Sequence, residues 1–158
     1  MVVAVNCKIK IDNSGLKEVL KACKEFEKPI KVGYLNNDEL ANKATTNHFG
    51  GVSMFPDGEK IEVPPRPFIT HAMDGYAKSI INAGNAFIED ELTRKSVKEK
   101  ILSVAENARD SIKLSIDEVG EWSPYPHNSP RTIGRKGFDK PLVDTGAMRD
   151  GVEFSVGE

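Results

Sequence analysis

The longest regular pattern in this chain is an apolar stripe at helical spacing that covers about residues 67–119. Ser96 and Glu99 interrupt it with a capping-box pattern, which predicts that a new helix begins after residues 93–95. Apolar side chains that recur every three or four residues lie on one face of a helix, and that face must be covered. The chain is therefore predicted to contain a long helix or helix pair packed against another layer.

Four shorter segments alternate apolar and polar residues, which is the pattern of strands with one buried face. They are residues 3–11, 30–34, 52–63 and 152–156. The third contains a Pro56-Asp57-Gly58 turn typical of a hairpin. This hairpin has few apolar side chains of its own, so it must pack against another surface, such as that of a neighbouring subunit.

Two shorter helices are predicted between these strands. Ser14 caps an apolar stripe that ends before Pro29, and Asp38 caps a helix that ends at Gly50 or Gly51. The chain of 158 residues fits a single structural domain. Residues 36–63, with their short helix and hairpin, and residues 121–146 form extensions of it.

Residues 121–146 differ from the rest because they combine prolines and glycines with no sustained apolar period. Such a long stretch is unusual in a compact domain unless it has a function. Trp122, Phe138 and Leu142 are spaced through it, so we predict a long loop that contacts another subunit.

Composition excludes several classes of protein. With 39% hydrophobic and 29% charged residues the chain is typical of a folded globular protein, and no stretch reaches the about 20 apolar residues of a membrane span. We predict no signal peptide and folding in the cytoplasm of the producing cell. The net charge of −2 is not that of a dedicated nucleic-acid binder. Cys7 and Cys23 are predicted to be reduced core residues.

No set of residues predicts catalysis, a metal or a cofactor. His48, His71 and His127 lie in separate contexts without a second ligand at helical spacing, so structural roles are favoured. Asp144-Thr145-Gly146 has the sequence of an aspartic-protease triplet, but it lacks the flanking strands of such a lobe. We interpret it as a turn in which Asp144 or Thr145 caps and Gly146 takes an unusual backbone angle.

Residues 131–140 hold a basic patch with Arg131, Arg135, Lys136 and Lys140 against Asp139. Such a patch suits phosphates or the acidic surface of a protein neighbour. The negative net charge favours the protein neighbour, and a nucleic-acid-binding module stays the alternative. A hydrolase built on Asp144 is a remote third hypothesis.

Three motifs, in order, resemble the tail-completion and virion-morphogenesis proteins of tailed phages, the neck or head–tail joining subunits. They are KATTNHFG, IEVPPRPFI and NSPRTIGRKGFDKPLVDTGAMRDGVEF, within about residues 41–156. The last is the most specific. The pattern departs at His48-Phe49, where an acidic residue is expected between the histidine and the phenylalanine.

The resemblance implies an α+β subunit with a small, mainly antiparallel sheet and helices packed on one face. It implies no enzyme activity, and a ring, commonly sixfold, between the neck and the tail tube through which DNA passes. The expected partners are copies of the chain and neighbouring neck, connector and tail-tube proteins. The expected location is the virion, assembled in the host cytoplasm.

Two groups of residues carry the site predictions. Those expected to be structural lie in the first two motifs: His48, Phe49, Gly50, Pro64, Pro65, Arg66, Pro67 and Phe68. Those expected to contact a subunit or partner lie in or beside residues 121–146: Trp122, Arg131, Arg135, Lys136, Phe138, Leu142, Asp144, Thr145, Gly146, Met148 and Arg149. For Trp122 and Leu142, burial in the chain's own core is an open alternative. The assembly hypothesis fails if residues 122–148 fold back tightly around a closed pocket with converging polar groups.

Overall fold

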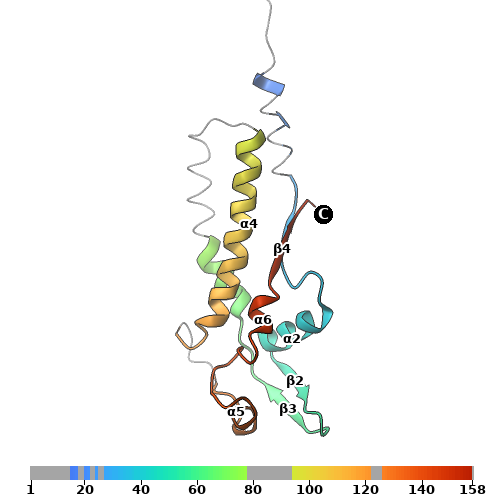
Figure 1. Ribbon diagram of the computed structural model, residues 1–158, viewed down its shortest axis with the longest axis vertical. Coiled ribbons are helices and arrows are strands. Elements are labelled where there is room, and N and C mark those ends of the chain that lie inside the picture. The colour runs from blue at the N-terminus through green and yellow to red at the C-terminus, as the bar shows by residue number, and fades with distance from the viewer. Residues whose placement is uncertain are drawn as a thin grey trace, which may run out of the picture.

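The computed structural model describes residues 15–17, 20, 21, 24, 27–77, 94–121 and 126–157 (Figure 1). Residues 68–77 are helical. Residues 15–17, 20, 21 and 24, which precede the first strand, are also helical. The labelled elements, in chain order, are β1 (Ile30–Gly33), α2 (Asp38–Phe49), β2 (Gly51–Met54), β3 (Lys60–Val63), α4 (Arg94–Asp117), α5 (Pro130–Lys136), α6 (Ala147–Asp150) and β4 (Glu153–Val156). The fold is α+β, as predicted.

The predicted strands near residues 30 and 154 pair with each other although they lie at opposite ends of the described chain. β1 and β4 are antiparallel, with Val32 opposite Phe154 and Ile30 opposite Val156. These side chains face α4, where Val156 packs against Val97 and Ile101. Alternation therefore gives this sheet one apolar face, which α4 covers; Figure 1 shows α4 running alongside β4.

The helix predicted after Asp38 is α2, and its cap differs from the prediction by one residue. Asn37 is the N-cap because its side chain accepts a hydrogen bond from the Leu40 amide at 3.0 Å. Asp38 lies in the first turn, where the positive end of the helix dipole stabilises its carboxylate. The helix ends at Gly50, as predicted, with a φ of 79°.

The hairpin predicted over residues 52–63 is formed by β2 and β3, with Val52 opposite Glu62 and Met54 opposite Lys60. The Phe55 carbonyl accepts the Gly58 amide, and the Phe55 amide donates to the Glu59 carbonyl, both at 2.9 Å. Gly58 has a φ of 88°. This is a turn closed by a glycine bulge, which the Pro-Asp-Gly sequence favours.

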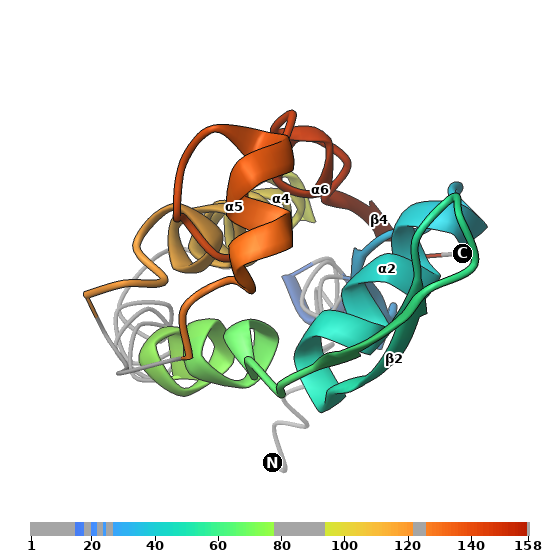
Figure 2. The same cartoon turned by 90° about the horizontal axis from the view of Figure 1, so that it is seen from below.

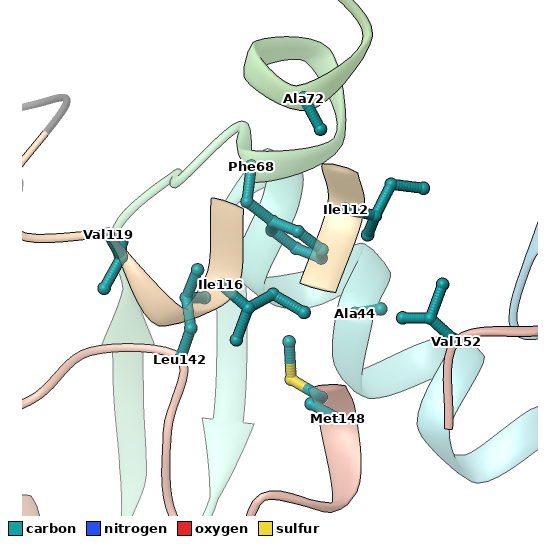
Figure 3. Close-up of a cluster of buried hydrophobic side chains, with 9 residues drawn as sticks. All are labelled: Ala44, Phe68, Ala72, Ile112, Ile116, Val119, Leu142, Met148 and Val152. Carbon is teal, nitrogen blue, oxygen red and sulfur yellow. The ribbon is translucent and has the colours of Figure 1, made fainter. Parts of the chain in front are cut away.

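One core cluster joins segments from both halves of the chain (Figure 3). Phe68 and Ile116 are fully buried at its centre, between α2 on one side and α6 on the other. The buried members are Ala44, Phe68, Ala72, Ile112, Ile116, Val119, Leu142, Met148 and Val152. The predicted helical stripe of residues 67–119 therefore covers this core from two directions.

The predicted loop over residues 121–146 contains a helix, which corrects the prediction that it lacks regular structure. Ser129 caps α5 by accepting the Thr132 amide at 3.2 Å, Pro130 occupies its first turn, and Gly137 ends it with a φ of 81°. The Ser-Pro and Lys-Gly signals for this helix were present, but a seven-residue helix has no apolar period to reveal it.

Several predictions fall outside the described residues. They are the strand of residues 3–11, Cys7, Cys23, most of the helix after Ser14, the join between the two long helices and Trp122. No helix in the described ranges is long and apolar enough to cross a membrane.

Candidate functional site

The first two motifs meet at a tight junction between α2 and the helix of residues 68–77. The Arg66 amide donates to the Asn47 carbonyl at 2.8 Å. A Cβ atom added at Gly50 would lie 3.0 Å from the Pro65 nitrogen, and the positive φ of Gly50 already disfavours a side chain there. The glycine and the prolines therefore fix the path between hairpin and helix, as their predicted structural role requires.

His48 is the polar centre of this junction. Its side chain is buried, its Nδ1 accepts the Ile69 amide at 3.4 Å, and its Nε2 lies 3.2 Å from Thr70 Oγ1. Nδ1 accepts only when it carries no proton, so this arrangement suits the neutral ring. Burial lowers the pKa of His48 below 6.5, which favours the same state. His48 thus caps the start of the helix of residues 68–77.

Arg66 extends the junction to the predicted loop of residues 121–146. Its side chain is buried, and one terminal guanidinium nitrogen donates to the Pro126 carbonyl at 3.2 Å. A buried arginine needs hydrogen-bonding partners because its charge leaves water. The bond therefore ties the beginning of the predicted loop to the chain's own core.

The triplet Asp144-Thr145-Gly146 forms a turn. The Thr145 hydroxyl accepts the Ala147 amide at 3.4 Å, and Gly146 has a φ of 86°, as the interpretation of this triplet required. Asp144 accepts a hydrogen bond from Arg135 at 2.6 Å instead of capping. Among the described residues, no group of three or more His, Cys, Asp or Glu could hold a metal ion.

The prediction that Leu142 and Met148 contact another subunit requires correction. Both side chains are buried in the core cluster beside Phe68 and Ile116. Leu142 has a φ of 62°, an angle that a side chain rarely adopts, so packing holds it in an unfavourable conformation. For Leu142, the open alternative of burial in its own subunit is the one that the structure supports.

A solvent-open groove of about 460 Å³ separates the hairpin from α5. Pro64, Arg66 and Leu142 line it, together with residues of β3 and α5. Figure 2 shows α5 on one side, with α2 and the hairpin on the other. Arg131 of α5 bridges to the hairpin by ion pairs with Asp57 and Glu59, and its guanidinium lies 4.0 Å from the Phe55 ring centre.

The predicted basic patch is paired within the chain. Besides Arg131, Arg135 pairs with Asp144, and Lys136 donates to the Lys140 carbonyl at 2.6 Å. Burial lowers the pKa of Lys136. Arg149, outside the patch, contacts Asp117 and Asp150. Acidic residues of the same chain therefore neutralise much of the charge that was expected to meet a neighbour or phosphates.

Residues 126–148 are folded back on their own chain. Asp139 accepts hydrogen bonds from the Asn128 backbone amide at 2.9 Å and side-chain amide at 3.0 Å, and it contacts His127 at 2.6 Å. These bonds lower the pKa of Asp139. One condition that would end the assembly hypothesis is thus met, but the other is not, because the groove is open rather than closed.

The described surface exposes three large apolar side chains that are close in sequence. Phe49 at the end of α2 is 74% exposed, and Val52 and Met54 of β2 are 62% and 66% exposed. We call these three residues the hairpin patch. Phe138 is also exposed, and Lys136 Nζ lies 4.8 Å from its ring centre. The few apolar side chains of the hairpin were the sequence signal for this surface, although Val52 and Met54 were not named as contact residues and Phe49 was expected to be structural.

Comparison with known proteins adds no assignment. No family model matches this chain, and no curated protein or solved structure matches it.

Proposed function

We propose that this chain is a structural subunit of the neck or tail of a tailed bacteriophage, a tail-completion or head–tail joining protein. Copies form a ring, commonly sixfold, that joins neighbouring neck, connector and tail-tube proteins and lets DNA pass. The ring belongs to the virion, is assembled in the host cytoplasm and performs no reaction. The hairpin patch supports this proposal most directly.

The patch supports the proposal because its apolar side chains are exposed to solvent in an isolated subunit. Phe49, Val52 and Met54 are more than half exposed, although apolar residues of their size stabilise a protein by about 1.5–3 kcal/mol each when buried. Val52 and Met54 lie on the same face of β2, and exposed apolar side chains that share one face are typical of a contact with another protein. Among the described residues, both two-stranded sheets also have edges without a neighbouring strand, to which a further strand can add.

The placement of the three motifs also supports the proposal. Asn47 and His48 contact the second motif at Arg66 and Ile69, and Phe68 packs in one core with Leu142 and Met148. The residues that carry the resemblance thus build the subunit and its junctions. This is what a family defined by architecture requires of its shared residues.

A mass measurement across a concentration series, followed by electron microscopy, tests the proposal. We expect rings, or a subunit that forms them only when mixed with purified tails or capsids of its phage. Val52→Asp should reduce ring formation because it places a charge in the patch at a residue that is 62% exposed. Leu114→Asp is the matched control, since Leu114 is an exposed apolar residue of α4. A subunit that stays monomeric and joins neither tails nor capsids contradicts the proposal.

The alternative, a nucleic-acid-binding module over residues 131–140, predicts DNA binding that weakens steeply with salt. The pairing of Arg131 and Arg135 with acidic residues of the same chain disfavours it. Reversing the charge of Lys136 and Lys140 provides the test. The alternative fails if both variants bind DNA like the wild type while ring assembly changes.

A further inference from the structure

The two edges of the β2–β3 hairpin differ in charge. β3 carries the exposed charged residues Lys60 and Glu62, whereas β2, with the sequence GVSM, has no charged residue. Charged side chains on an edge strand discourage pairing with another strand, and an uncharged edge lacks this protection. The β2 edge is therefore the one that is open to a further strand.

The direction of the backbone groups can be read from the turn. Because the Phe55 amide donates to the Glu59 carbonyl, the hydrogen-bonded pairs along the ladder are Phe55–Glu59, Ser53–Ile61 and Gly51–Val63. The amides and carbonyls of Val52 and Met54 then point away from β3. In the part of the chain that the structure describes, neither residue makes another hydrogen bond.

Contacts within the subunit fix the conformation of the β2 edge. Arg131 fixes the tip of the hairpin through Asp57, Glu59 and the Phe55 ring. At the base, Gly50 packs against Pro65. A preformed edge loses little conformational freedom on pairing, so even a short strand is an effective template.

We infer that two copies of this chain pair antiparallel through their β2 edges, about a two-fold axis that passes through Ser53. This register places Val52 opposite Met54 of the second copy, and Met54 opposite Val52 of the second copy. Both residues have outward backbone groups, so each pair exchanges both of its hydrogen bonds. Pro56 limits the pairing because it has no amide to donate at the next outward position.

A second copy fits this edge because the edge is complementary to itself. In the paired sheet, the two rows that contain Val52 and Met54 have these residues in the middle, with Lys60 at one end and Glu62 of the second copy at the other. The centre of each of these two rows is apolar, and its ends carry opposite charges. No row opposes like charges, which would be destabilising.

This inference goes beyond the proposed ring and does not depend on it. A contact in which both copies use the same surface closes after two copies, whereas a ring requires head-to-tail contacts. The pairing therefore describes how free subunits cover the β2 edge. A four-residue strand buries little area, so we expect a dimer that forms only as concentration rises.

Disulfide trapping tests the register. Ser53 is exposed and lies on the proposed axis, where opposed Cα atoms are about 4.5 Å apart, within the about 4.4–6.8 Å that a disulfide spans. In a Cys7→Ala/Cys23→Ala background, Ser53→Cys should form a covalent dimer under mild oxidation. Val52→Cys should link much more slowly, because its two copies are diagonal at about 7–8 Å. Linking of Val52→Cys as fast as Ser53→Cys, or no linking of either, overturns the inference.

Sedimentation provides a second test that keeps the native cysteines. The full chain should shift from monomer to dimer as concentration rises, and Met54→Lys should weaken the dimer about tenfold or more. Leu114→Lys, on α4, should leave it unchanged. A dimer that tolerates Met54→Lys, or a chain that is monomeric throughout, overturns the pairing. Rings formed with purified tails by a chain that never dimerises would leave the proposed function standing while the pairing falls.

Discussion

The core cluster and the hairpin patch contain the same residue types in opposite environments. Met148 is 8% exposed and Met54 is 66% exposed, while Phe68 is fully buried and Phe49 is 74% exposed. Packing around Phe68 joins α2, α4 and α6, whereas the patch lies at the exposed end of α2 and on the two-stranded hairpin that follows it. The comparison separates residues that hold the subunit together from those available to a partner.

Substitution of Phe68 and of Phe49 is the strongest test of this comparison, because the expected difference in stability is largest there. Phe68→Ala should lower the free energy of unfolding by about 3–5 kcal/mol, because it leaves a cavity at the centre of the core. Phe49→Ala should lower it by about 1 kcal/mol or less, because the ring is 74% exposed and loses an edge contact with the His48 ring. Urea unfolding of both variants measures the difference, and equal losses would mean that Phe49 is buried in the folded subunit.

Substitution of Met148 and of Met54 tests whether Met148 belongs to the core of its own subunit. Met148→Ala should cost about 2–5 kcal/mol, whereas Met54→Ala should fall within about 0.5 kcal/mol of the wild type. The same unfolding experiment applies. If Met148→Ala leaves stability intact but impairs assembly, the original prediction of a subunit contact at Met148 is restored.

His48 adds a pH dependence to the stability of the buried region. Because burial lowers the pKa of the folded state below 6.5, the unfolded chain takes up its proton first as the pH falls. The contribution of His48 to stability is therefore complete above pH 6.5 and declines from there toward the lower folded pKa. Unfolding midpoints measured at several pH values should show this decline, and His48→Ala should remove it.

The same substitution should cost about 1–3 kcal/mol at neutral pH, because the buried Ile69 amide loses its acceptor. His127→Ala is a suitable control, since the His127 side chain is 89% exposed. A decline below pH 6.5 that persists unchanged in His48→Ala would assign the pH dependence to another group.

The smallest expected effect belongs to the bridge between α5 and the hairpin. Arg131→Ala should lower stability by only about 0.2–1 kcal/mol, because the ion pairs with Asp57 and Glu59 are largely exposed. Hydrogen exchange should nevertheless quicken at the amides of β2 and β3, since the hairpin tip loses its attachment. Arg109→Ala, which removes a contact with the adjacent Asp110, should leave those amides unchanged.

Local patterns were sufficient for most of the described elements. Alternation predicted β1, β4 and the hairpin, the Pro56-Asp57-Gly58 turn was found as predicted, and the end of α2 at Gly50 follows from the freedom of glycine at a positive φ. Helical spacing also predicted the buried faces of residues 68–77 and of α4. These signals are local because they depend on neighbours within about one helical turn or one strand.

The environment of each apolar residue was decided by tertiary contacts. Nothing near Leu142 or Met148 in the sequence states that they will pack beside Phe68, since that contact joins positions more than 70 residues apart. Likewise, the cations of residues 131–140 gave no sign that Asp57, Glu59 and Asp144 would pair with them. Burial and ion pairing depend on which surfaces the folded chain brings together, and an apolar period reports only that a face exists, not what covers it.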